Sequence, residues 1–191
     1  MEQNKEMTAQ ESLSIITETF NKNRKDIVRN SAKYFLLWGA LLTIISLVIY
    51  LLWHCTGKPE WNLLWFAMPV IGYPLAALAG RYDHKMPQNE VSKMLGGVWG
   101  VFGAFAITLS AIAIFLVPMN ISLIIVIILG LAECISGVLL KNWPIIVAGF
   151  ILGVGGAVFA MLVKDDAQLL IFTLGGVLLL VTGIIMKLQN K

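Results

Sequence analysis

A single carboxylate stands inside the long apolar runs of this chain, and it is the residue there best suited to chemistry. Glu133 lies in a stretch that runs from Gly130 to Lys141. An acidic side chain within a membrane is a candidate for carrying a proton or binding a cation. Alternatively, it bonds a neighbouring hydroxyl or backbone carbonyl and holds helices together, and removal from water favours its neutral form. Hydroxyl partners for this second role are available at Thr108, Ser110, Thr173 and Thr182.

The frame around this carboxylate occurs twice. Each copy has two glycines seven residues apart, a hydroxyl residue just before the second glycine, and a lysine four residues after it. The copies are Gly130, Ser136, Gly137 and Lys141, then Gly176, Thr182, Gly183 and Lys187. Leu179 occupies in the second copy the place of Glu133 in the first. We therefore predict a repeat of 96–141 and 142–187, and a third copy in 34–80 fits less well.

A second candidate site is the segment from Pro69 to Pro74. Two prolines five residues apart remove two backbone donors and free the carbonyls that these would have bonded. Transporters place substrates at broken helices of this kind, but kinks without function are also tolerated in membrane helices, and the pattern favours the latter. Tyr73, between the prolines, is the side chain to follow, so the candidate binding residues are Glu133, Tyr73 and Ser136.

No pattern typical of catalysis accompanies these residues. The chain has no glycine-rich phosphate loop, no serine nucleophile elbow and no His-Glu-x-x-His helix. The pairs Asp83 with His84 and His54 with Cys55 offer two ligands each, whereas a metal site needs three or four. We expect no enzymatic activity, no catalytic residue, no metal, no cofactor and no nucleic-acid partner.

Composition places these residues in a membrane. Of 191 residues, 58% are hydrophobic and only 13% are charged, and the mean hydropathy is +0.82. Soluble domains carry about 25% charged residues. So much apolar surface requires the bilayer as its solvent, which excludes an ordinary soluble domain.

Six apolar runs follow a polar segment at 1–33. Each is near the ~20 residues that a helix needs to cross a ~30 Å hydrocarbon core. They lie at about 34–53, 61–80, 94–117, 121–140, 144–163 and 167–187. Because the connections are short, we predict an all-α integral membrane domain, 34–191, with six transmembrane helices in antiparallel hairpins.

The polar segment 1–33 has the pattern of an amphipathic helix. Thr8 and Glu11 fit a capping box, and apolar residues recur at helical spacing at Leu13, Ile16, Phe20 and Ile27. Its cations are Lys22, Arg24, Lys25, Arg29 and Lys33. They either contact anionic lipid headgroups, at ~1 kcal/mol each, or belong to a solvated lead-in helix and only fix the topology.

The cations also predict the orientation. With six spans, every lysine and arginine except Lys58 and Lys164 falls on one side of the membrane. The positive-inside rule then puts both termini in the cytoplasm. We expect a multi-pass protein of the cell inner (plasma) membrane. Within it, small residues spaced four or seven apart should form the helix contacts.

Two functions fit this architecture. The first is a polytopic membrane protein without enzymatic activity, working as an accessory, sensory or interaction subunit. The alternative is a small proton- or cation-linked transporter or channel that uses Glu133 and the Pro69–Pro74 helix break. A transporter needs further polar residues facing Glu133, and the spans offer mostly Thr and Ser, so the first is favoured. The expected partners are the lipid bilayer and either a second copy in a homodimer or a membrane or cytoplasmic protein.

Overall fold

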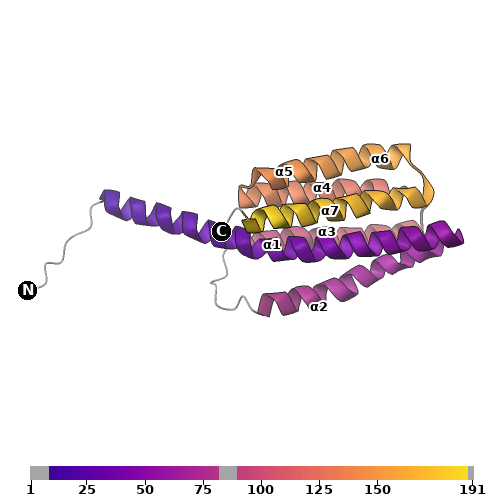
Figure 1. Cartoon of the computed structure of the whole chain (residues 1–191), viewed down its shortest axis with the longest axis horizontal. Helices are drawn as coiled ribbons and strands as arrows, with labels where there is room; N and C mark the ends of the chain where they lie inside the picture. The colour runs from indigo at the N-terminus through magenta and orange to yellow at the C-terminus, as the bar shows by residue number, and fades with distance from the viewer. Residues whose placement is uncertain (1–8, 82–89, 189–191) are drawn as a thin grey trace, which may run out of the picture.

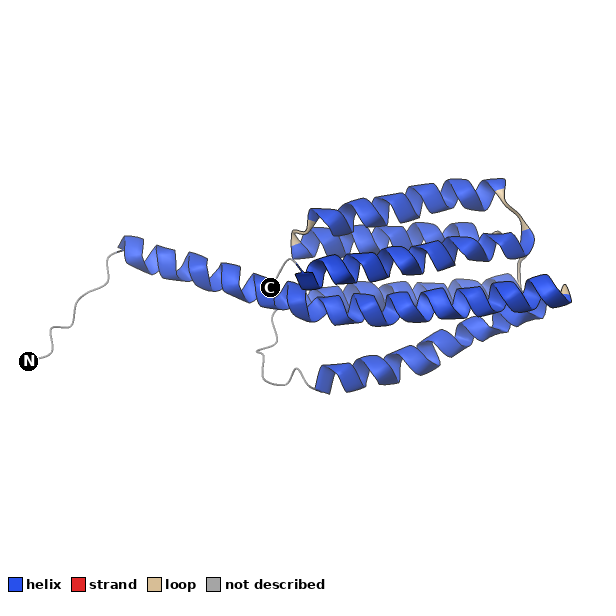
Figure 2. Ribbon diagram, viewed as in Figure 1, coloured by secondary structure: helices blue, strands red, loops and turns tan. Residues whose placement is uncertain are grey.

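The computed structural model describes residues 9–81 and 90–188, and both ranges are almost entirely helical (Figures 1 and 2). Six of its helical segments are long and apolar enough to cross a membrane, which confirms the predicted all-α fold with six spans. They are Asn30–Thr56, Pro59–Arg81, Val91–Phe115, Ile121–Leu140, Trp143–Leu162 and Asp165–Leu188.

The first span belongs to a helix much longer than a membrane requires. α1 runs from Ala9 to Thr56 without interruption, so the amphipathic segment and the first span are one helix. Its N-terminal part leaves the bundle along the direction of the spans (Figure 1). The sequence predicts an amphipathic helix within 1–33 and a span from about 34, and the structure joins them. No proline or glycine occurs in it before Gly39, so nothing in its sequence breaks the backbone hydrogen bonding.

Three of the other spans, the second, the fifth and the sixth, change helical type along their length. In the second span, a 3₁₀ helix, η1 (Pro59–Phe66), leads into α2 (Ala67–Arg81). In the fifth span, a π-helical turn, η2 (Ile151–Gly155), joins α5 (Trp143–Phe150) to α6 (Gly156–Leu162). The rest of the bundle is formed by α3 (Glu90–Phe115), α4 (Ile121–Leu140), the short 3₁₀ turn η3 (Asp165–Gln168) and α7 (Leu169–Leu188).

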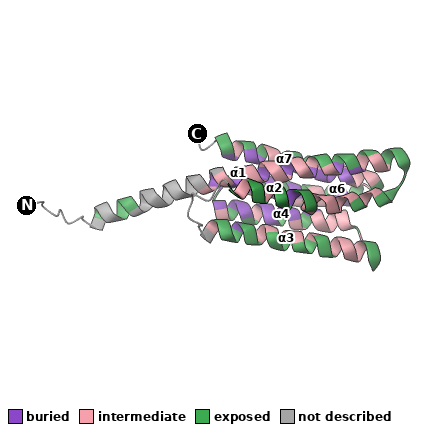
Figure 3. Cartoon of the chain, turned by 90° about the horizontal axis from the view of Figure 1, so that it is seen from below, coloured by how far each residue is buried: buried purple, intermediate pink, exposed green. Residues whose placement is uncertain are grey.

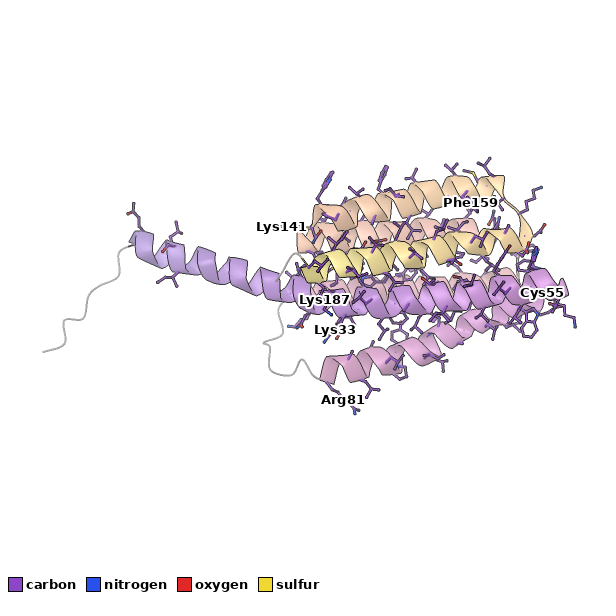
Figure 4. All side chains as sticks on the ribbon, viewed as in Figure 1. Lys33, Cys55, Arg81, Lys141, Phe159 and Lys187 are labelled. Carbon is purple, nitrogen blue, oxygen red and sulfur yellow. The ribbon has the colours of Figure 1, made fainter. Side chains whose placement is uncertain are left out.

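The helices follow one another around the bundle. α2 packs on α1, α1 on α7, α7 on the fifth span, the fifth span on α4, and α4 on α3. Lys33, Arg81, Lys141 and Lys187 gather at one end, and Cys55 lies at the other (Figure 4). We call these the basic end and the opposite end. α1 enters and α7 finishes at the basic end, as an even number of spans requires (Figure 1).

Two of these contacts bring backbone against backbone. A Cβ added at Gly39 of α1 would lie 2.9 Å from both the Gly176 oxygen and the Leu180 nitrogen of α7. One added at Gly149 of α5 would lie 2.8 Å from the Gly130 oxygen and 2.7 Å from the Cys134 nitrogen of α4. Real Cβ atoms do not approach so closely, so only glycine permits either helix pair to meet at this distance.

These contacts relate α4 to α7. Gly130 and Cys134 stand 46 residues before Gly176 and Leu180, so both helices receive an antiparallel neighbour at the same positions. With that shift, every buried residue of α4 except Ala132 has a buried counterpart in α7. The two helices therefore present the same face, α4 to the fifth span and α7 to α1.

α3 and α2 are much less covered. In the most apolar stretch of α3 no residue is buried, whereas half of that stretch of α7 is (Figure 3). Cβ atoms added at Gly96, Gly97 and Gly100 would meet nothing within 4 Å. Lipid tails are as apolar as the side chains on these helices, so leaving them exposed to the membrane carries little penalty.

The glycine contacts give a test of the packing. Gly39→Ala inserts a methyl group between α1 and α7 and should destabilise the protein by about 1–3 kcal/mol, the usual cost of overpacking. Gly100→Ala is the matched control, because the added methyl meets open space and alanine favours a helix. The measurement is reversible unfolding of the purified protein in mixed micelles. Equal stability of the two variants would contradict the backbone contact at Gly39.

Candidate functional site

Glu133 lies on the inward face of α4, removed from all outside contact. Its exposed fraction is 0%, and neither carboxyl oxygen has a hydrogen-bond partner among the described residues. A buried polar group without a partner loses its bonds to water and gains nothing in exchange. A carboxylate in that position costs far more than a neutral carboxylic acid, so the neutral form is the one that fits this surrounding.

The nearest polar side chains along α4 are already engaged. Ser136, also fully buried, donates its hydroxyl to the Ala132 carbonyl oxygen at 2.7 Å. Cys134 directs its thiol to the Ile146 carbonyl oxygen of α5 at 3.4 Å. Both bonds satisfy backbone oxygens, and neither supplies a donor to Glu133.

The hydroxyl residues predicted as partners of Glu133 lie in several surroundings. Thr173 bonds Ser46 across the α1–α7 contact at 2.9 Å. Thr182 is buried, Ser110 is half-buried, and Thr108 is exposed on the outside of α3. The structure assigns none of them a hydrogen bond to the carboxyl group, so the predicted helix-holding bond is absent from the described residues.

The π-helical turn of the fifth span lies beside this part of α4. Gly153, within η2, meets Gly130, one turn before Glu133, and a Cβ added at Gly153 would lie 3.3 Å from the Gly130 Cα. A π turn shifts the backbone bonding pattern and is found often at functional sites in helices. Sequence reasoning missed it, because nothing in the glycine spacing of this run distinguishes a π turn from an ordinary helix.

Leu179 of α7 occupies the position that corresponds to Glu133. Its exposed fraction is 2%, and its Cβ lies near Gly39 at the α1–α7 contact. An apolar side chain therefore fills this position in one copy of the frame, and a carboxyl group fills it in the other. The shared helix packing does not by itself require an acid.

Tyr73 lies in a different part of the bundle from Glu133. Its ring packs edge to face on Trp38 of α1, with 5.6 Å between centroids, and half of the residue is exposed. α2 packs chiefly on α1 and η1, whereas α4 packs on α3 and the fifth span. Pro69 falls in the first turn of α2, and Pro74 is inside the helix. The change of helical type comes before Pro69, between η1 and α2.

The predicted headgroup-binding cations divide into two groups. Lys33 donates its ammonium to the Ala79 carbonyl oxygen near the end of α2, at 2.9 Å, and lies 5.2 Å from the centre of the Tyr34 ring. It therefore helps to hold α2 against α1. The other four belong to α1, and their side chains are outside the described part of the structure: Lys22, Arg24, Lys25 and Arg29.

A side-chain hydrogen bond at the opposite end was not predicted. His54 Nδ1 and Asp166 Oδ2 are 2.7 Å apart and join the last turn of α1 to η3, while Tyr50 stacks on the histidine ring. The residues are 112 positions apart, and a sequence pattern gives no sign of such a pairing. Within 9–81 and 90–188, no three His, Cys, Asp or Glu side chains gather as a metal site requires.

Comparison with known proteins identifies no relative of this chain. No protein-family model, no curated protein and no solved structure matches the chain.

The unpartnered state of Glu133 predicts an unusual mutational result. Glu133→Leu replaces a buried polar group without a partner by the residue found at position 179, and should leave stability unchanged or raise it by about 1–3 kcal/mol. Leu179→Ala is the control, because loss of a buried leucine side chain should destabilise by roughly 2–5 kcal/mol. Unfolding in mixed micelles measures both. Clear destabilisation by Glu133→Leu would show that the carboxyl group makes a stabilising bond.

Proposed function

We propose that this chain is a non-enzymatic multi-pass protein of the plasma membrane that serves as an interaction subunit, and that α1 binds a cytoplasmic protein partner. The observation that carries the proposal is the extension of α1 beyond the bundle. The bundle contacts of α1 begin at Ile27 and Val28. The preceding residues, 9–26, continue the helix for about 27 Å at 1.5 Å per residue.

The exposure of this extension supports a binding role. Leu13 is 67% exposed and Ile15 is 49% exposed, both in a part of the helix that stands outside the bundle. Isolated helices of this length are only marginally stable in water, and most helices depend on packing of an apolar face. A partner that covers one apolar face of this extension would supply that packing.

The helical period relates this extension to a face of α1 that is already an interface. Positions 16 and 20 precede Tyr34 and Trp38 by eighteen residues each, which is five complete turns. α2 covers α1 at Tyr34 and Trp38. Beyond the end of α2 at Arg81, the same face of α1 continues, and we propose that a helix of the partner takes the place of α2 there.

Site-specific photo-crosslinking tests this proposal. A photoreactive amino acid at position 13 or 16 should give one discrete protein adduct in intact cells, because those positions lie on the face of α1 that α2 covers further along the helix. The same residue at Leu162, which is 78% exposed but near the opposite end, is the control and should give only lipid adducts. Deletion of residues 9–26 should abolish co-purification of the crosslinked protein while the six-span domain stays folded. The absence of a discrete adduct at both positions would refute the proposal.

The proposed orientation has its own test, because Cys55 and Cys134 are both free and differ in exposure. If the basic end is cytoplasmic, a membrane-impermeant maleimide should label exposed Cys55 in intact cells, and Cys55→Ser should remove that labelling. Lys141→Cys in the Cys55→Ser background should react only after the cells are opened. The reverse pattern would place the termini outside the cytoplasm.

A further inference from the structure

The polar groups near Glu133 are distributed unequally along α4. Toward the basic end, Ser136 follows after about one turn, and Asn142 begins the next helix; both are buried. Toward the opposite end, the buried residues of α4 have no polar side chain: Ala132, Gly130, Leu129 and Val126. A side chain at this depth therefore has polar neighbours on its own helix in one direction and apolar ones in the other.

No described charge compensates the carboxyl group. On the elements packed against α4, the charged and titratable side chains of the described residues stand near the helix ends, and Cys134 is the exception in the middle of the bundle. Those groups are Lys33, Tyr34, Tyr50, His54 and Cys55 on α1, Lys93 on α3, Lys141 after α4, Lys164 after α6, Asp165 and Asp166 in η3, and Lys187 on α7. The fifth span has none between Trp143 and Leu162. A proton is therefore the ligand that neutralises Glu133.

We infer that Glu133 is an exchangeable proton-binding site within the membrane, and that its proton moves to and from the basic end of the bundle past Ser136. Release breaks the O–H bond of the carboxylic acid, passes the proton to water at the basic end and leaves a carboxylate. This inference does not depend on the partner of α1 proposed above.

Three observations favour a proton-binding role over a purely structural one. A structural acid would bond a neighbouring group, and neither oxygen does so among the described residues. The corresponding position on α7 holds a leucine, so packing does not demand an acid there. The π-helical turn, a feature found often at functional sites, lies beside the turn of α4 before Glu133.

Infrared difference spectroscopy in reconstituted membranes tests the inference. The wild-type protein minus Glu133→Gln should show the carbonyl stretch of one neutral carboxylic acid. After transfer to D₂O this band should shift within minutes, because the proton exchanges. Glu133→Leu provides a second reference spectrum if Glu133→Gln does not fold.

The proposed route is tested by Ser136→Ala. This variant should keep the band but slow its shift in D₂O several-fold, because the buried hydroxyl beside the acid is lost. Thr173→Val, which removes a hydroxyl in the α1–α7 contact, is the matched control and should leave the rate unchanged. An equal rate for wild type and Ser136→Ala would overturn the route.

Carbodiimide labelling gives an independent readout on the wild-type protein. An apolar carbodiimide, which reacts with neutral carboxylic acids in membranes, should modify the peptide containing Glu133, and a water-soluble one should not. A missing infrared band together with no modification would show a permanent carboxylate and overturn the inference. A band that never shifts in D₂O would also overturn it, because the proton would then be sealed in place.

Discussion

Close approach of glycine to backbone is the constraint on which this bundle depends. In lipid, helices gain little from hiding apolar side chains, so association relies on packing and backbone proximity. Gly39 against α7 and Gly149 against α4 provide it, each placed so that a Cβ would lie less than 3 Å from backbone atoms. The two contacts use corresponding positions on α4 and α7. The order of the helices around the bundle follows from these two contacts, because α7 packs on α1 and α4 packs on the fifth span.

The sequence was sufficient for the number and placement of the spans, because their length and apolarity are fixed by the thickness of the bilayer. The expectation that small residues spaced four apart form helix contacts holds for Gly149 and Gly153 but is wrong for Gly96 and Gly100, where an added Cβ would meet nothing within 4 Å. The sequence could not show that α7 receives α1, since a glycine face is compatible with any helix that approaches closely. The continuity of α1 was missed for a related reason. The change from polar to apolar residues near 33 marks the membrane boundary, not the end of a helix.

The candidate site, too, could be predicted only in part from the sequence. Glu133 was recognisable from its residue type alone, because an acid in an apolar run is costly. The absence of a hydrogen-bond partner for Glu133 could not be predicted. The hydroxyl groups of residues 173 and 182 would reach different neighbours in different arrangements of the helices. Thr173 instead bonds Ser46, and Ser136 bonds the backbone of its own helix. Lys33, a candidate for lipid headgroup contact by its charge, also bonds the backbone of α2, which no sequence pattern indicates.

The contact between α2 and α3 is looser than the two glycine contacts, and the residues at this contact explain the difference. Gly103 of α3 would be available for a close approach, but a Cβ there would meet the hydroxyl of Tyr73 and not a helix backbone. Pro74 also lacks the backbone donor that a regular helix uses at that point. Without a glycine opposite Gly103, the two backbones stay apart, and the apolar side chains of α3 are left to the lipid. Because lipid solvates them as well as protein would, the bundle loses little stability by leaving one of its contacts loose.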